Sequence, residues 1–295
     1  MMARDPVIIA VDGGGSGCRA AVGKPTKGIL AQAAGGPANA TTDPRGAVQN
    51  VLAAVQRAAE QAGVPTLALG DAVAHLGLAG IMSAQQGQAV AQALPFATCI
   101  VTDDRPTTVA GALGGADGFV AAIGTGSFVG RGRTHVFRAA GGWGLALSDQ
   151  ASGAWLGREA LVRVFLSHDK VEPSTALTDG LMAHFGGDPN AIVAFSQTAT
   201  PADYARLAPH IVDAAQAGDP TAKEIMEQGA DYIASALAAL GYTKGNPLCL
   251  TGGIGPQYAT YLPRAMQQAV IPATGTALDG AFALARAMLS GGEAL

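Results

Sequence analysis

The sequence predicts an α/β protein of two lobes built on an internal repeat. A chain of 295 residues exceeds the usual size of one domain. Short apolar strand candidates alternate with helical patterns along it. The series of apolar strand, glycine turn and outgoing strand occurs at 7–23 and again at 118–132. We place the lobe boundary at 114–117, which gives lobes of residues 1–115 and 116–295, with the last helix a candidate to return to the first lobe.

The first lobe begins with a meander of three strands joined by glycine turns. A helix follows, because Val48, Val51, Leu52 and Val55 fall on one helical face. Strands and helices then alternate up to the boundary. The strand candidates are 7–11, 18–23, 28–33, 72–78 and 98–101, and the helix candidates are 47–62, 83–94 and a segment that starts near Pro106.

The second lobe repeats the opening pattern of strand, glycine turn and strand, and then becomes mostly helical. Its central stretch, 172–222, is helical with turns at 186–189 and 218–220. That stretch can serve either as a homodimer surface or as a lid. The strand candidates are 118–123, 128–132, 138–140 and 248–250, and the further helix candidates are 154–166, 222–240 and 279–289.

Composition and charge exclude several classes of partner. The net charge is −4, and the 18 Lys and Arg residues are spread too thinly for a nucleic-acid or membrane surface. No apolar run approaches the roughly 20 residues of a bilayer span. We therefore expect a cytoplasmic protein without nucleic-acid or membrane partners. Cys18, Cys99 and Cys249 show no paired spacing, which predicts buried thiols rather than a disulfide or metal site.

Two glycine turns are candidates for phosphate binding. Asp12 ends the first apolar strand and precedes Gly13-Gly14-Gly15-Ser16, and Gly124-Thr125-Gly126 occupies the same place in the repeat. Glycines let backbone N–H groups approach phosphate oxygens closely, and the carboxylate of Asp12 can hold Mg²⁺ through water. Each turn alone could be an ordinary hairpin. The pattern is neither a Walker motif nor a dinucleotide fingerprint, since no Lys-Ser or Lys-Thr pair and no helix follows the glycines.

Two further segments carry polar candidates. Asp103 and Asp104 follow a strand and precede a helix, where one carboxylate can accept the proton of an attacking hydroxyl while the other raises its pKa. Either residue could instead only cap the helix. Trp143 lies among glycines near Asp149, a combination that suits a sugar, although a buried core tryptophan is the alternative.

The ordered set of motifs resembles that of the N-acetylglucosamine kinases. These belong to the BadF/BadG-type ATPases, within the superfamily of actin, sugar kinases and Hsp70. The resemblance covers nearly the whole chain and is weakest over 172–222. It implies an actin-like fold of two ribonuclease H-like duplicated domains with the active site in the cleft between the lobes. The motifs are 9–16, Gly36-Pro37-Ala38-Asn39, Thr102-Asp103-Asp104, Gly124-Thr125-Gly126-Ser127, Gly142-Trp143-Gly144, Asp149 and Thr251-Gly252-Gly253.

The resemblance implies transfer of the ATP γ-phosphoryl group to the 6-hydroxyl of N-acetylglucosamine or a related amino sugar, with Mg²⁺. Asp104 would be the base, chosen over Asp103 because its spacing to Gly124 fits the family better. The residues implied to bind Mg²⁺ and the phosphates are Asp12, Gly13, Gly14, Gly15, Ser16, Gly124, Thr125 and Gly126, those for adenosine are Gly252, Gly253 and Gly255, and those for the sugar are Asn39, Asp104, Gly142, Trp143, Gly144 and Asp149.

One departure from the family pattern concerns the sugar loop. Relatives usually carry Gly-Asp-Glu-Gly-Ser where this chain has Ser148-Asp149-Gln150-Ala151-Ser152. A charged group has become neutral at Gln150, so glucosamine or another hexose is an alternative acceptor. Two other functions are an ATP-driven activator of a dehydratase, disfavoured because no cysteine lies near another in sequence, and a non-catalytic sugar sensor, disfavoured by the retained aspartates.

Overall fold

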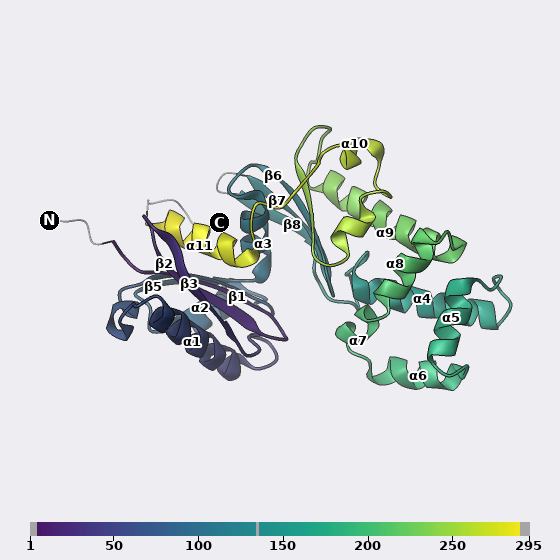
Figure 1. The fold of residues 1–295 in the computed structure, drawn as a ribbon, viewed down its shortest axis with the longest axis horizontal. Coiled ribbons are helices and arrows are strands. Elements are labelled where there is room, and N and C mark those ends of the chain that lie inside the picture. The colour runs from purple at the N-terminus through teal and green to yellow at the C-terminus, as the bar shows by residue number, and fades with distance from the viewer. Residues whose placement is uncertain (1–4, 134–135, 290–295) are drawn as a thin grey trace. The chain divides into compact units, whose positions relative to one another are not determined.

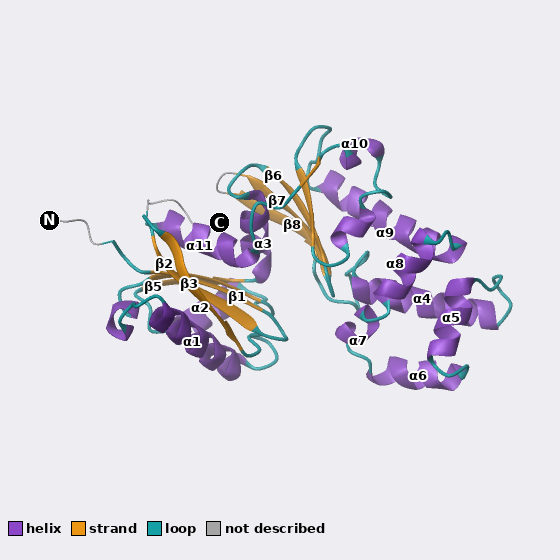
Figure 2. Ribbon diagram, in the orientation of Figure 1, coloured by secondary structure: helices purple, strands orange, loops and turns teal. Residues whose placement is uncertain are grey.

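The computed structural model describes residues 5–133 and 136–289, which divide into two compact units (Figure 1). Unit 1 contains the described residues up to 118, those of 131–137 and those from 273 onward. Unit 2 contains 119–130 and 138–272. Each unit has one five-stranded sheet covered by helices, so the α/β class predicted from the sequence is confirmed (Figure 2).

The sheet of unit 1 has the strand order β3-β2-β1-β4-β5. Strands β1, β2 and β3 form an antiparallel meander, whereas β1, β4 and β5 run parallel. The carboxyl ends of these three parallel strands therefore meet at one edge of the sheet. The strands are β1 (Ile8–Gly13), β2 (Cys18–Lys24), β3 (Gly28–Gly35), β4 (Val73–Leu78) and β5 (Thr98–Thr102).

Helices cover both faces of this sheet. The amphipathic helix α1 buries Val51 and Val55 in one apolar cluster with β1 and β4, and its N-terminus is capped by the Asp43 side chain. On the other face α11 packs on α3, β1 and β4, and Phe282 joins the cluster of Ile8 and Ala10. The helices of this unit are α1 (Pro44–Gln61), α2 (Ala84–Gln92), α3 (Asp104–Leu113) and α11 (Ala277–Met288), with a 3₁₀ turn at Thr66–Leu69.

Unit 2 repeats the sheet topology of unit 1. Its order is β10-β9-β6-β7-β8, so that β6 to β10 take the places of β1 to β5 in turn. Strands β6, β9 and β10 run parallel, as their counterparts do. The internal repeat predicted from the sequence is thus present in the fold. The strands are β6 (Gly118–Ile123), β7 (Ser127–Arg133), β8 (Val136–Gly141), β9 (Leu248–Thr251) and β10 (Val270–Ile271).

The helices of unit 2 form a large apolar core centred on α4, α8 and α9, which bury Leu156, Ile211 and Ile233. The stretch predicted as helical, 172–222, contains four helices and the start of α9. None of the helices within 5–133 and 136–289 has the length and apolar character of a bilayer span. The helices are α4 (Gly153–His168), α5 (Ala176–His184), α6 (Pro189–Thr198), α7 (Pro201–Ala205), α8 (Ala208–Gln216), α9 (Pro220–Ala239) and α10 (Arg264–Gln267), with a 3₁₀ turn at Gly255–Tyr258.

Candidate active site

Two aspartates of unit 1 line one open pocket at the carboxyl edge of its sheet. Asp12 on β1, Gly77 on β4 and Thr102 on β5 lie in register across the three parallel strands. The chain leaves β5 directly into α3, so Asp104 reaches the pocket that Asp12 lines. Its volume is about 410 Å³. This edge is where α/β sheets usually bind ligands.

The glycine turn after β1 forms part of the same pocket. Gly13, Gly14 and Ser16 line it, whereas Gly15 lies exposed in the turn. The turn is held by hydrogen bonds from the N–H of Gly14 to the Gly17 carbonyl and from the N–H of Ala38 to the Gly14 carbonyl, both 2.9 Å. A Cβ atom at Gly13 would lie 2.6 Å from the Leu78 side chain. A larger residue at Gly13 would therefore require the Leu78 side chain to shift at the end of β4.

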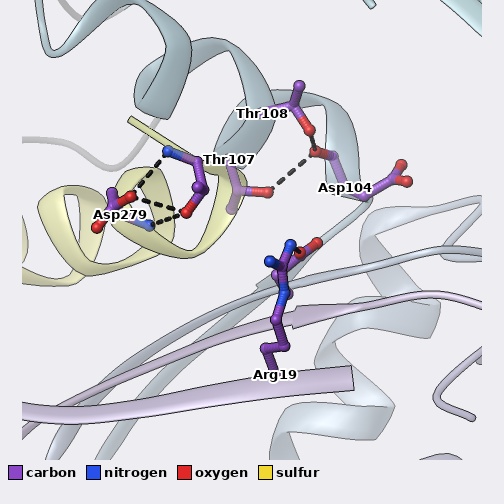
Figure 3. A network of polar contacts seen from close by, with 7 residues as sticks. Arg19, Asp104, Thr107, Thr108 and Asp279 are labelled. Carbon is purple, nitrogen blue, oxygen red and sulfur yellow. Dashed lines mark hydrogen bonds and ion pairs between the residues drawn. The ribbon is translucent and has the colours of Figure 1, made fainter. Parts of the chain in front are cut away.

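Asp12 is paired with a cation that sequence reasoning missed. Arg19 lies directly opposite Asp12 on the antiparallel strand β2, and its Nη2 donates to Asp12 Oδ2 at 2.8 Å. The Arg19 side chain is 56% exposed and lines the pocket. Figure 3 shows it extending from its strand. The Asp12 carboxylate is thus paired with a cation in this structure, and a carboxylate oxygen is the kind of ligand that Mg²⁺ takes together with water and phosphate oxygens.

The neighbours Asp103 and Asp104 have different roles in the structure. Asp103 is the N-cap of α3, and its Oδ1 accepts from the backbone N–H of Arg105 at 2.9 Å. The Arg105 guanidinium also donates to both Asp103 oxygens, at 2.8 and 3.1 Å. The carboxylate of Asp103 is therefore occupied by a cap and a fork-shaped ion pair.

Asp104 lies in the first turn of α3 and projects its carboxyl group into the pocket. Its backbone carbonyl accepts from the hydroxyls of Thr107 and Thr108 at 2.9 and 2.8 Å, and Figure 3 shows the carboxyl pointing away from both hydroxyls. Burial is the main cause that raises the pKa of Asp104, with the charges of Asp103 and Asp12 adding to it. Of the two aspartates, Asp104 is thus the one suited to accept a proton.

Asn39 belongs to a loop that packs beside this pocket, but it does not line the pocket. Its Oδ1 accepts from the backbone N–H groups of Thr41 at 2.9 Å and Thr42 at 3.1 Å. Gly80, with φ of +84°, leaves room for the Asn39 side chain, which would lie 2.4 Å from a Cβ atom there. The side-chain oxygen of Asn39 therefore stabilises the loop to which Asn39 belongs.

In unit 2, two predicted glycine turns lie side by side at the ends of the parallel strands β6 and β9. A Cβ atom at Gly252, where φ is +80°, would lie 2.2 Å from the Ile123 carbonyl oxygen and 3.1 Å from the Gly124 nitrogen. The amides of Gly153 and Ala154 at the start of α4 donate to the carbonyls of the first turn, Gly124 at 2.8 Å and Thr125 at 3.2 Å.

The residues of these two turns differ in their exposure to solvent. Thr125, Gly252 and Gly253 are exposed, and Gly124 and Gly126 are partly so. Gly255 is buried, with its Cβ position 3.2 Å from the Leu250 carbonyl carbon. The exposed members leave their backbone groups accessible, whereas Gly255 lets the chain turn close to β9.

Asp149 organises the tryptophan loop of unit 2. It is 6% exposed and has a φ of 62°, in the left-handed region. Its Oδ1 accepts from the N–H of Gly144 at 3.3 Å, and its Oδ2 would lie 2.9 Å from a Cβ atom at Gly126. Burial raises the pKa of Asp149, and hydrogen bonds from the backbone of Gly144 and Ser127 oppose that rise. Asp149 therefore ties the tryptophan loop to the turn at 124–126.

Trp143 is exposed, with 62% of its surface accessible, and so are its neighbours Gly142 and Gly144. The alternative that Trp143 is a buried core tryptophan is therefore wrong. An exposed aromatic face among glycines is accessible to the apolar face of a sugar ring. The backbone oxygen of Gln150 accepts from the Ser127 hydroxyl at 2.6 Å, so Gln150 lies beside the same turn.

Residues 9–277 match the model of the BadF/BadG/BcrA/BcrD ATPase family. The chain belongs to this family of ATPases. A glucosamine kinase of Vibrio cholerae is 34% identical to it over 289 residues, which are 94% of this chain and 95% of that protein. An N-acetyl-D-glucosamine kinase of Dictyostelium discoideum is 32% identical over 147 residues, 46% of each chain.

A solved structure shares the fold of this ATPase over nearly its whole length. It is a protein of Chromobacterium violaceum assigned as an N-acetylglucosamine kinase, with a TM-score of 0.85 and 33% identity. The match covers 95% of this chain and 99% of that one. The membership predicted from the ordered motifs is thus confirmed.

Sequence reasoning missed Arg19 because its importance depends on pairing. Arg19 acquires its partner through the register of β1 with β2, which no local motif reveals. It is the only charged residue within the predicted strand 18–23, and a charge opposite Asp12 across a short hairpin is the signal that could have found it.

Proposed function

We propose that this ATPase is an ATP-dependent amino-sugar kinase, with N-acetylglucosamine or glucosamine as its acceptor. The observation that carries the proposal is that Asp12, the glycine turn and Asp104 line one and the same pocket of unit 1. Phosphoryl transfer to an alcohol requires a phosphate site and a base, and a carboxyl group of raised pKa beside a glycine turn can serve as that base. The similarity to a glucosamine kinase over 94% of the chain supports the amino-sugar class.

Asp104 is the proposed base. It accepts the proton of the attacking hydroxyl, for which we propose the 6-hydroxyl of the sugar, as the sugar oxygen forms its bond to the γ-phosphorus. The bond from that phosphorus to the β–γ bridging oxygen breaks, and ADP leaves. Burial, together with the neighbouring carboxylates of Asp103 and Asp12, disfavours the ionised form of Asp104, which makes it a stronger base at neutral pH.

The glycine turns are proposed to bind the nucleotide. Backbone groups of Gly13, Gly14, Gly15 and Ser16 in unit 1, and of 124–126 in unit 2, would contact phosphate oxygens, while Gly252 and Gly253 would contact the adenosine. Asp12 would hold Mg²⁺, which when bound neutralises charge on the phosphates. In this proposal Gly255 and Asn39 support their loops. Gly255 is buried, and the side-chain oxygen of Asn39 accepts hydrogen bonds from backbone amides.

The sugar is proposed to lie on the exposed ring of Trp143, with Asp149 holding the loop in place.

Because the reaction consumes ATP, we place the protein in the cytoplasm. The helices α5 to α8 are proposed either as a homodimer surface or as a lid.

The dehydratase-activator reading has weaker support. Its iron–sulfur cluster would need thiols at a subunit surface. Cys18 and Cys249 are buried and Cys99 is only partly accessible, and burial raises the pKa of all three thiols. Buried neutral thiols are poor ligands for a surface cluster.

A coupled ADP-release assay tests the function. ATP and Mg²⁺ are supplied with N-acetylglucosamine, glucosamine, glucose, N-acetylmannosamine or no sugar. The proposal expects ADP release that depends on one of the two glucosamine-class sugars. ADP release at the same rate without sugar would contradict it.

A further inference from the structure

Arg19 is a charged group of the Asp12 pocket that the proposed mechanism does not use. The ten residues that line this pocket include the two carboxylates of Asp12 and Asp104, and Arg19 is the only cation among them. A polyanionic phosphate chain that entered this pocket would meet two negative charges. The guanidinium is the lining group that can offset them.

The geometry leaves most of the guanidinium available. Only Nη2 of Arg19 is engaged, in the 2.8 Å contact with Asp12 Oδ2, among the residues that the structure describes. A guanidinium has five N–H donors in a rigid fork. The Arg19 side chain is more than half exposed, whereas that of Asp12 is 21% exposed, so the arginine is the member of the pair that can move at low cost.

Two kinds of anion therefore compete for one cation. A single carboxylate contact through one nitrogen is weaker than a two-bonded contact with phosphate oxygens, which the planar guanidinium fork matches. While Arg19 covers Asp12, the carboxylate is neutralised and a divalent cation gains less by binding there. A phosphate that draws Arg19 away would expose the full charge of Asp12.

We propose that Arg19 is an exchangeable counter-ion of Asp12. In the nucleotide-free protein Arg19 pairs with Asp12, and in the nucleotide complex it binds a phosphate group of ATP and releases Asp12 to a divalent cation. Formation of the metal site thereby depends on nucleotide binding. The inference rests on the proposed function only in taking the turn at 13–16 as a phosphate site.

Two binding measurements test the exchange without any sugar. Calorimetry with ATP, and separately with adenosine, is performed in excess chelator on the wild type, Arg19→Gln, Arg19→Lys and the control Arg45→Gln, an exposed arginine of α1. Paramagnetic resonance then measures free Mn²⁺ in titrations of nucleotide-free protein. Thermal melting establishes that each variant is folded, and Arg19→Lys retains the charge should Arg19→Gln fail to fold.

The proposal expects opposite effects from the one substitution. Arg19→Gln weakens ATP binding about tenfold or more, the value of a charge-assisted hydrogen bond, and leaves adenosine binding unchanged. The same variant binds Mn²⁺ more tightly than the wild type when no nucleotide is present. Arg19→Lys loses part of the ATP affinity, and Arg45→Gln changes neither quantity.

Three outcomes are distinguishable from this one. Equal losses for ATP and adenosine would reduce Arg19 to a structural role and overturn the proposal. Unchanged ATP affinity, or Mn²⁺ binding no tighter in Arg19→Gln, would also overturn it. A wild type that binds neither ATP nor adenosine would instead contradict the proposed kinase function.

Discussion

At the scale of single residues, the sequence Asp103-Asp104 divides two tasks between neighbouring carboxylates. Asp103 caps α3 and pairs with Arg105, while Asp104 faces the pocket with a raised pKa. The cap fixes the start of the helix, and the helix start fixes where the carboxyl group of Asp104 projects. A structural residue thus determines the position of the proposed base.

Substitution of each aspartate by asparagine separates these tasks. Asp104→Asn removes the base and should lower kcat about 10²-fold to 10⁴-fold, with ATP affinity nearly unchanged. Asp103→Asn retains a capping side chain and should keep activity at neutral pH. Pre-steady-state rates and nucleotide titrations measure both. A large loss in Asp103→Asn together with a small one in Asp104→Asn would reverse the assignment.

The pH dependence of the same variants tests the electrostatic argument. A base must be ionised to act, so kcat/KM falls as the pH drops through the pKa of Asp104, which lies above the ordinary 3.8. The Asp103 carboxylate raises that pKa. Its removal in Asp103→Asn takes this contribution away, so the pKa of Asp104 falls. The acid limb of the kcat/KM profile should therefore move to lower pH, and a shift to higher pH would contradict this argument.

A second titratable group, His75, affects stability rather than the proposed reaction. It is fully buried on β4, and neither ring nitrogen has a hydrogen-bond partner in the part of the chain that the structure describes. Burial lowers the pKa of His75 from 6.5 to about 4. The unfolded chain binds the proton more readily than the folded one, so stability is lost as the pH falls from 6.5 toward 4, by roughly 3 kcal/mol in all.

Replacement of His75 by leucine should remove this loss. The free energy of unfolding, measured in urea at pH 7, 5.5 and 4.5, is expected to fall less steeply with acid in His75→Leu than in the wild type. Parallel curves for the two proteins would show that His75 is not the origin of the acid sensitivity.

At the scale of secondary structure elements, α3 and α11 cross in backbone contact. A Cβ atom at Gly111 would lie 1.8 Å from the carbonyl oxygen of Thr276, and one at Gly280 would lie 1.9 Å from that of Thr107. Thr107 also donates to the carbonyl of Asp104 in the first turn of α3. The last helix of the chain thus helps to hold the helix that presents the proposed base.

The glycine crossing gives a stability prediction. Gly280→Ala forces α3 and α11 apart, because the obstacle is backbone, and should destabilise unit 1 by about 1–3 kcal/mol. The control is Gly70→Ala, an exposed position of negative φ where the new Cβ meets only the Leu67 carbonyl oxygen at 3.5 Å. Thermal or urea unfolding compares them. Equal stability of the two variants would contradict the crossing.

The sequence predicts the elements whose signals are local. Capping residues and glycines visible in the chain mark helix boundaries, since Asp103 caps the start of α3 and Gly63 follows the end of α1. The short strand β10 and helix α10 were not predicted, because a two-residue strand is defined only by its pairing with β9. The roles of Asn39 and Asp149 could not be predicted either, since they depend on turns that fold back onto each side chain.

At the scale of the whole molecule, one arrangement of strands occurs twice, but the side chains near the first glycine turn differ between the two units. Both sheets end their first strand in a glycine turn, but only unit 1 places an aspartate and its arginine there, while unit 2 supplies an exposed tryptophan. The repeat could be predicted from the recurring turns. The different side chains of the two units could not be predicted in this way, because their roles follow from long-range pairing such as that of Arg19 with Asp12.

The most direct test of the proposed kinase function is the stoichiometry of its products. The protein is incubated with ATP, Mg²⁺ and N-acetylglucosamine or glucosamine, and phosphorus magnetic resonance and mass spectrometry measure ADP and sugar phosphate together. The proposal predicts one sugar 6-phosphate for each ADP, and neither product in Asp104→Asn. ADP and inorganic phosphate without any sugar phosphate would contradict it.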